Sequence, residues 1–229
     1  MNRYTELDGI ILKNSRIGEF HKGVRIFSPE SGITEATAYG GYKPKSKIGP
    51  LVSPLSCGHF VLYHNPKARK PKIEDFSPEH TFIAIQSDLK KYYTVLTWFE
   101  IILRSHGGGD SSAGFYLNLI SFMQLLENAP EDQIVYINIQ CILRFLSILG
   151  FPPDIYLQKR NSMIEYTKES LSAGIFKYVD YTSGLSPEQA VRIKLDRKDV
   201  VLLEDAVLSI VQTVLECRLN TLSGMLDEI

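Results

Sequence analysis

Short runs of hydrophobic and β-favouring residues, separated by turn-forming residues, fill the first third of the chain. Five runs are rich in the β-branched and aromatic residues typical of strands: residues 9–12, 24–27, 33–39, 57–63 and 73–76. A Ser-Pro-Glu-Ser-Gly sequence that favours a turn ends the second run. A long connection with glycines and lysines follows the third. This pattern predicts a small five-stranded barrel of the OB type, and an SH3-like barrel fits it nearly as well.

After Phe76 the apolar residues recur every three or four positions, which is the spacing of one face of a helix. Four long stripes show this spacing, within residues 89–103, 115–126, 134–148 and 200–214. Glycines 107–109 are expected to end the first stripe, and Asp110 and Ser111 are candidate caps for the second. Gly150 and the two prolines that follow it are expected to end the third stripe.

The rest of the second part is less regular. Residues 186–189 read Ser-Pro-Glu-Gln, which has the spacing of a capping box with proline at the first helical position. The segment from Tyr156 to Gly184 is mixed in period, so irregular or partly stranded structure is predicted there. The stripes pack most simply as a helical bundle that needs no cofactor. The predicted fold class is therefore α+β, with an amino-terminal five-stranded OB-type β-barrel in residues 1–78 and an all-helical carboxy-terminal domain in residues 79–229.

The charges are distributed unevenly along the 229 residues. The net charge of the chain is −1. Residues 1–76 hold 12 lysines and arginines against 7 aspartates and glutamates, a net charge of +5, so the remaining residues carry −6. A basic third attached to an acidic remainder indicates that one part of the molecule faces a polyanion, although small domains also drift in charge by chance.

Residues 40–47 read Gly-Gly-Tyr-Lys-Pro-Lys-Ser-Lys and are the sharpest local feature. In an extended or looping segment alternate side chains point the same way, so the three lysines are expected to follow successive phosphates while the glycines allow close approach of the backbone. Four aromatic residues are candidates either to stack on bases or to fill the barrel core: Tyr39, Tyr42, Phe60 and Tyr63. The predicted DNA-binding set consists of Lys13, Arg16, Lys22, Arg25, Tyr42, Lys43, Lys45, Lys47, Lys67, Arg69, Lys70 and Lys72.

No catalytic or metal-binding motif is found. The five histidines lack an HExxH-type spacing and are expected on the surface or in loops. The glycine run at 107–109 lacks the lysine of a phosphate-binding loop, and no serine lies in a GxSxG sequence. The three cysteines are far apart and are expected to be buried hydrophobic residues. We therefore predict a protein without enzymatic activity, metal or cofactor, while an enzyme with dispersed catalytic residues stays open.

The opening residues 1–16 are polar and contain no apolar stretch long enough for a signal peptide or a spanning helix. A soluble, cytoplasmic protein that does not contact membranes is therefore expected.

Several short elements carry a likeness to known proteins. They lie in the first strand and loop, the second hairpin, the basic segment with the strand after it, and a Leu-Gly-Phe-Pro-Pro sequence: Thr5, residues 9–13, Arg16, Gly18, Glu19, residues 27–30, Gly32, Gly40, residues 43–47, Leu51, Pro54 and residues 149–153. Together these elements resemble the RecO recombination mediators.

This resemblance implies an OB-fold amino-terminal domain and a helical carboxy-terminal domain. It implies binding of single- and double-stranded DNA and annealing of complementary strands. It also implies displacement of single-strand-binding protein so that a recombinase can load, RecR as a partner, and a place in the cytoplasm with the nucleoid.

The chain also departs from the family. Many members have four zinc-ligating cysteines after the Gly-Phe-Pro element, whereas residues 157–184 contain none, so the region of about 156–184 is expected to be a degenerate zinc module without metal. Tyr42 stands where an arginine is common and Tyr39 where a lysine is common, so stacking is expected to replace part of the lost charge. The alternative hypothesis is an OB-fold protein-interaction module without nucleic-acid activity.

Overall fold

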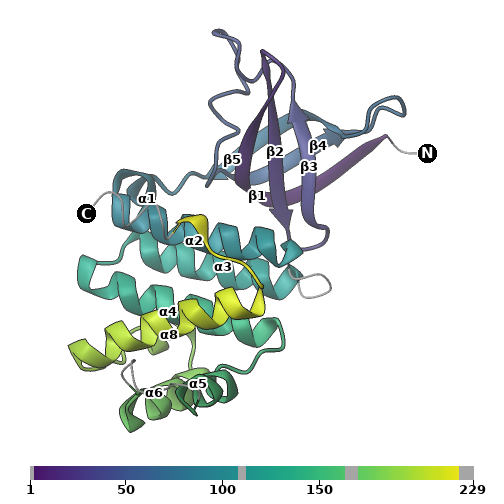
Figure 1. Ribbon diagram of the computed structural model, residues 1–229. Coiled ribbons are helices and arrows are strands. Elements are labelled where there is room, and N and C mark those ends of the chain that lie inside the picture. Colours follow the sequence, from purple (N-terminus) through teal and green to yellow (C-terminus); the bar gives the residue numbers. More distant parts are fainter. Residues whose placement is uncertain (1–2, 108–111, 163–169, 222–229) are drawn as a thin grey trace. The chain divides into compact units, whose positions relative to one another are not determined.

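The computed structural model describes residues 3–107, 112–162 and 170–221 (Figure 1). The chain divides into two compact units, one of Met1–Ile83 with Ser105–Tyr116 and the other of Ala84–Arg104 with Leu117–Ile229. The described strands all lie in the first unit, and most of the helices lie in the second. The predicted α+β class, with five strands ahead of the helices, is confirmed.

The strands pair in an order that closes the sheet on itself. They are β1 (Tyr4–Ile17), β2 (His21–Ser28), β3 (Gly32–Ala38), β4 (Cys57–Tyr63) and β5 (Lys72–His80). The order is β1-β2-β3-β5-β4, and β4 returns to β1, so the sheet forms a closed barrel. The long β1 makes closure possible because its first half, to Ile10, pairs with β4 and its second half pairs with β2. The pairing with β2 contains a register shift between Ile11 and Lys13. β3 and β5 are parallel, whereas the other pairs are antiparallel.

The interior of the barrel is filled by alternate residues of the strands. Leu7 and Ile11 of β1, Val24 and Ile26 of β2, and residues from the other strands belong to one buried apolar cluster. Phe60 of β4 is fully buried and stacks on Phe76 of β5, with ring centroids 4.2 Å apart. The two-residue period of the strands places polar neighbours of these residues outside.

The second part of the chain is helical. Its helices are α1 (Ile83–Ser87), α2 (Leu89–Arg104), α3 (Ser112–Glu127), α4 (Glu131–Ile148), α5 (Pro153–Ser162), α6 (Ala173–Ser183), α7 (Pro187–Ala190) and α8 (Arg197–Val214). The four predicted stripes correspond to α2, α3, α4 and α8, and the predicted capping box at Ser186 starts α7. The predicted stop at residues 107–109 and the predicted caps Asp110 and Ser111 fall largely outside the described residues. α8 packs mainly on α4 and α5.

The prediction for residues 156–184 was wrong where the structure describes them. They contain the end of α5 and all of α6, and no strand is found in the described part of this segment. In α6 the buried residues Ile175, Tyr178, Val179 and Thr182 have helical spacing, and the Ser172 hydroxyl caps the helix by accepting from the Ile175 amide. The β-branched and aromatic residues around position 177 also favour a strand, so the helical spacing was not recognised in the sequence.

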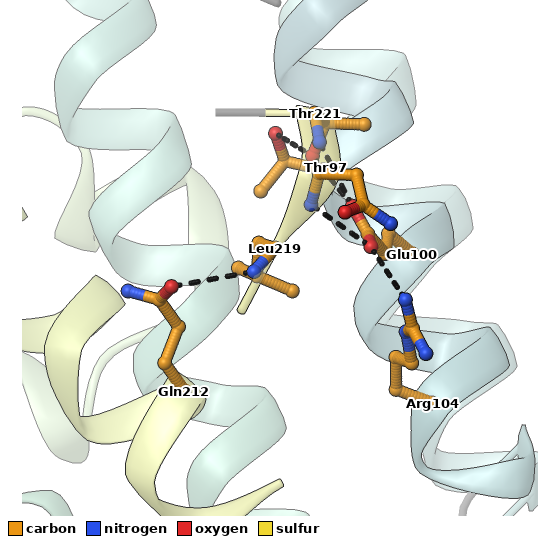
Figure 2. A network of polar contacts seen from close by, with 7 residues as sticks. Thr97, Glu100, Arg104, Gln212, Leu219 and Thr221 are labelled. Atoms are coloured by element: carbon orange, nitrogen blue, oxygen red, sulfur yellow. Dashed lines mark hydrogen bonds and ion pairs between the residues drawn. The ribbon is translucent and has the colours of Figure 1, made fainter. Parts of the chain in front are cut away.

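Residues 215–221 return from α8 to α2 and are held there by polar contacts (Figure 2). The Glu100 carboxylate of α2 accepts from the amides of Asn220 and Thr221, each at 3.0 Å, and from the Thr221 hydroxyl at 3.0 Å. Gln212 of α8 accepts from the Leu219 amide at 3.3 Å. The last described residues are thus hydrogen-bonded to both α2 and α8.

Cys57 and Cys141 are buried, as predicted, whereas Cys217 is partly exposed. The histidines are exposed or partly exposed, and His21, His59 and His80 lie on strands. No single helix in the described ranges has both the length and the apolar character needed to cross a membrane, although the bent pair Glu131–Ile148 and Pro153–Asn161 meets that standard on length and composition.

Candidate nucleic-acid interface

The connection between β3 and β4, residues 39–56, is built into the barrel. Val52 and Leu55 are fully buried, and Ile48 packs against the apolar core. The side-chain amide of Asn14 in β1 donates to the Val52 carbonyl at 3.0 Å. The second half of the connection is therefore anchored, and it fixes the lysine-rich first half to the barrel.

The buried side chain of Lys22 in β2 also holds the connection between β3 and β4. Its side chain is 9% exposed, and its ammonium donates to the carbonyl oxygens of Gly49 at 2.7 Å and Val52 at 3.4 Å. Burial lowers the pKa of this ammonium. The Lys22 ammonium thus already has two carbonyl acceptors within the connection, and we assign it a structural role there. That Lys22 also contacts DNA stays a prediction.

The lysine segment folds as consecutive turns and is not extended. The Lys43 amide donates to the Gly40 carbonyl, and the Ser46 amide donates to the Lys43 carbonyl, both at 2.9 Å. Turns remove the two-residue alternation of an extended chain. The turns give no support for an alignment of Lys43, Lys45 and Lys47 by alternation, and their contact with phosphates stays a prediction. All three residues are exposed.

Two glycines let this connection fold back on itself. A Cβ atom added to Gly49 would overlap the carbonyl of Gly41. Gly40 also has a left-handed backbone, with φ of +69°. The glycines thus shape the segment that presents the lysines.

Exposed aromatic rings and cations meet at the junction of this segment with the β1–β2 turn. Phe20, Tyr39 and Tyr42 are 41%, 50% and 41% exposed, which is high for large aromatic residues. The Arg16 guanidinium lies 5.4 Å from the centroid of the Tyr42 ring, and the Lys43 ammonium lies 5.9 Å from that of the Phe20 ring. We call these five residues the aromatic–basic cluster.

Hydrogen bonds of the backbone hold the aromatic–basic cluster in place. The Tyr42 amide donates to the Phe20 carbonyl at 2.9 Å, and the Gly40 amide donates to Nδ1 of His21 at 2.9 Å. The His21 ring also packs edge-on against the Tyr39 ring, with centroids 4.8 Å apart. Fixed aromatic faces beside cations are what proteins use to hold unpaired bases without reading sequence.

The four aromatic residues predicted to stack on bases or to fill the core lie in three different places. Tyr39 and Tyr42 join the aromatic–basic cluster, whereas Phe60 belongs to the barrel core. Tyr63 lies elsewhere and contacts the Tyr4 ring, with centroids 5.2 Å apart. Phe20 was missed, because the sequence shows no reason for an aromatic residue between Glu19 and His21 to stay exposed. Its place directly before a strand was the only signal.

A second basic group lies on the outer side of β1, β2 and β3. Lys13 is the cross-strand neighbour of Arg25, and Arg25 is that of Glu35. Glu35 accepts from Arg25 at 3.0 Å and also pairs with Lys70. The hydrogen bond from Lys70 is the main reason why the pKa of the Glu35 carboxyl is lowered.

The remaining predicted cations lie in or near the β4–β5 connection. Lys67 and Arg69 are exposed there, and Lys72 pairs with Glu74 at 2.8 Å. Exposed pairs of this kind contribute little to stability, about 0–1 kcal/mol. Paired cations such as Lys70 and Lys72 can therefore exchange a carboxylate for a phosphate at small cost.

The opposite half of the barrel is acidic. Glu6 and Asp8 of β1 flank His59 of β4, whose ring nitrogens lie 3.7 Å from the Glu6 carboxylate and 2.7 Å from that of Asp8. The hydrogen bond to Asp8 is the main reason why the pKa of His59 is raised. The two halves of β1 thus carry opposite charges, which leaves the second half as the side that attracts a polyanion.

No three histidine, cysteine, aspartate or glutamate side chains converge as metal ligands in the parts of the chain that the structure describes. The side chains brought together here can bind an anionic, aromatic polymer by charge and stacking, and they offer no nucleophile paired with a base.

Comparison with known proteins supports the family likeness. The family described as "Recombination protein O N terminal" matches residues 1–82, which cover the whole barrel. The barrel of this chain is thus similar to the amino-terminal domain of RecO. A "DNA repair protein RecO" from Oceanobacillus iheyensis is 41% identical over 151 residues, which are 66% of this chain and 57% of that protein.

Two other proteins with the name "DNA repair protein RecO" are also similar to this chain. The RecO protein of a Thermoanaerobacter species is 24% identical over 153 residues, 67% of this chain and 60% of its own length. A RecO protein of Bacillus cereus is 36% identical over 59 residues, 26% of this chain and 24% of its own. The chain thus spans less than two thirds of the length of these RecO relatives.

Proposed function

We propose that this protein acts in DNA repair and recombination by binding single-stranded DNA at the aromatic–basic cluster. The observation that carries the proposal is the presence of three exposed rings, two of them next to cations, on the basic half of a small barrel. The names of the RecO relatives support the same process.

The proposed interface includes both basic groups of the barrel. It consists of Lys13, Arg16, Phe20, Arg25, Tyr39, Tyr42, Lys43, Lys45, Lys47, Lys67, Arg69, Lys70 and Lys72. Bases stack on the rings of the aromatic–basic cluster, while the lysines and arginines neutralise phosphates. Double-stranded DNA binds more weakly to the rings because its bases are already stacked, so it relies on the cations.

We infer a mediator without enzymatic activity. Two complementary strands repel each other through their phosphates, and cations that screen this repulsion let the strands pair without nucleotide hydrolysis. In this proposal the protein anneals strands that are coated with single-strand-binding protein, helps to load the recombinase, and works with RecR in the cytoplasm at the nucleoid.

Annealing of complementary oligonucleotides coated with single-strand-binding protein tests this function. The proposal predicts that the full chain accelerates pairing without nucleotide, and that a Tyr42→Leu/Lys43→Ala variant loses most of the acceleration. The alternative, a protein-interaction module, predicts no acceleration and no more binding to poly-dT than an acidic control protein shows. Acceleration that survives in the double variant would move the activity away from the aromatic–basic cluster.

A further inference from the structure

A cleft in the helical unit has a chemistry unlike that of the barrel. It has a volume of about 1080 Å³ and is bordered by α2, α4 and α8. Both α2 and α8 pack on α4, so α4 forms the floor of the cleft. A cleft of this size holds more than one side chain of a ligand.

The lining of the cleft is mainly apolar. Ile134, Val135, Val200, Val201 and Leu208 line it. Two threonines of α2 also line it, but their hydroxyls already donate to backbone carbonyls of their own helix, at 2.8 Å for Thr94 and 3.0 Å for Thr97. These side chains favour aliphatic groups.

One carboxylate is fixed within these apolar surroundings. The indole Nε1 of Trp98 donates to Oδ1 of Asn138 at 2.9 Å, and Nδ2 of Asn138 donates to Oε1 of Glu204 at 2.8 Å. Trp98 is fully buried and Asn138 is 8% exposed. Glu204 therefore has a defined position at the cleft, set by a chain of hydrogen bonds from the core.

The charges around the cleft are mostly negative. Four carboxylates line it, those of Glu131, Asp132, Glu204 and Asp205, against two cations, Lys90 and Arg197. Lys90 pairs with the exposed Glu131 at 3.5 Å. Burial raises the pKa of the Glu204 carboxyl, and the neighbouring Asp205 charge adds to this effect. Among the described residues, no cation forms a direct ion pair with Glu204. A carboxylate held in an apolar site is stabilised by a cation that displaces the remaining water.

We propose that this cleft binds a basic side chain of a partner protein, with its cationic group on Glu204 and its aliphatic stem along α4 and α8. Arginine and lysine fit because each joins a cation to a flexible alkyl chain. Nucleic acid is disfavoured because its phosphates would approach an acidic rim. The cleft lies outside the proposed DNA interface, so this inference does not depend on the proposed function.

Hexylguanidinium is a minimal probe for this site, and hexylurea is its neutral counterpart of similar shape. Trp98 is the only tryptophan of the chain, so its indole N–H resonance in a ¹⁵N-labelled sample reports on the hydrogen-bond chain that ends at Glu204. Each probe is titrated to the full chain at neutral pH up to 10 millimolar, and the shift of this resonance is followed.

Glu204→Gln removes the charge and keeps the size of the side chain, and Asp205→Asn makes the same change at the adjacent, exposed residue. The proposal predicts that hexylguanidinium binds wild type and Asp205→Asn within about twofold of each other, and binds Glu204→Gln at least about tenfold more weakly. Hexylurea is expected to bind wild type at least about tenfold more weakly than hexylguanidinium.

The comparison of the two probes on wild type needs no substitution, so it decides the matter even if Glu204→Gln fails to fold. Equal affinity for both probes would show an apolar cleft without cation recognition and would overturn the proposal. An unshifted Trp98 resonance throughout the hexylguanidinium titration would overturn it as well.

Discussion

At the scale of single residues, Lys22 stabilises the connection that carries the aromatic–basic cluster. A buried carbonyl that loses its donor costs about 1–3 kcal/mol, and a charged donor is at the upper end of this range. Lys22 supplies such a donor to Gly49 and Val52. The lysine with the least exposure in the predicted DNA set is thus the one whose removal should affect folding most.

Lys22→Met keeps the unbranched stem and removes the ammonium. We expect amide hydrogen exchange in residues 48–56 to become about 5- to 100-fold faster, as a local loss of about 1–3 kcal/mol implies. Mass spectrometry of peptides from this segment measures the change. Lys45→Met, at an exposed position, is the matched control and should leave the exchange unchanged. Equal exchange in the two variants would show that Lys22 does not hold the connection.

Tyr42 is the ring of the aromatic–basic cluster that lies beside two cations, Arg16 and Lys22. Stacking of one base on an aromatic side chain contributes about 1–3 kcal/mol, so Tyr42→Leu should weaken binding of poly-dT by about 5- to 100-fold. Tyr42→Phe should keep most of the affinity because the ring is kept. Fluorescence anisotropy with a labelled oligonucleotide measures both.

The matched control for Tyr42 is Tyr181→Leu, which removes an exposed ring from α6. Its affinity for poly-dT should equal that of wild type. If Tyr42→Leu also binds as wild type does, the bases do not stack on this ring.

At the scale of elements, the contact between Glu100 of α2 and residues 220–221 depends on charge (Figure 2). Burial alone would raise the pKa of the Glu100 carboxyl, but the hydrogen bonds from Thr221 and Asn220 outweigh it and the pKa lies below its ordinary value of 4.5. A carboxyl whose pKa is lower in the folded state stabilises that state above its unfolded pKa, and this contribution is lost as the pH falls through the folded value.

The variant Glu100→Gln tests this dependence. At pH 7 it should unfold at a lower urea concentration than wild type, and the difference should shrink steadily below pH 4.5, the ordinary value, as wild-type Glu100 becomes protonated. Trp98 fluorescence follows the unfolding of the helical unit. A difference that stays constant or grows between pH 7 and strongly acidic conditions would contradict the role of the charged carboxylate.

Elements with a clean period were predictable, and those with mixed signals were not. The strands and α2, α3, α4 and α8 follow their spacing, because burial of one face decides each of them. α6 was missed because Ile175, Phe176, Tyr178 and Val179 also suit a strand, and only packing of the helix chooses between the two. The turns of residues 40–46 depend on contacts with distant residues such as Phe20 and His21, which local sequence does not show.

At the scale of the whole molecule, the uneven charge of the sequence becomes a division within the barrel itself. The first half of β1 pairs with β4 beside Glu6, Asp8 and His59, and the second half pairs with β2 beside the cations. The net charge of residues 1–76 indicated a polyanion but could not show this division, because it arises only when β1 changes its partner. Most residues of the candidate site were therefore named from the sequence, whereas Phe20 and the folded shape of the connection were not.

The salt dependence of poly-dT binding tests the central claim, that the exposed cations of the barrel contact DNA phosphates, most directly. In a plot of the logarithm of the binding constant against the logarithm of the salt concentration, each phosphate contact on a single strand contributes a slope of about −0.7. Replacing Lys43, Lys45 and Lys47 together by alanine should therefore make the slope less negative by about two units. The control replaces Lys177, Arg192 and Lys194, three exposed cations of the helical unit, and should leave the slope unchanged. A slope that is the same in wild type and in the Lys43/Lys45/Lys47 variant would contradict the claim.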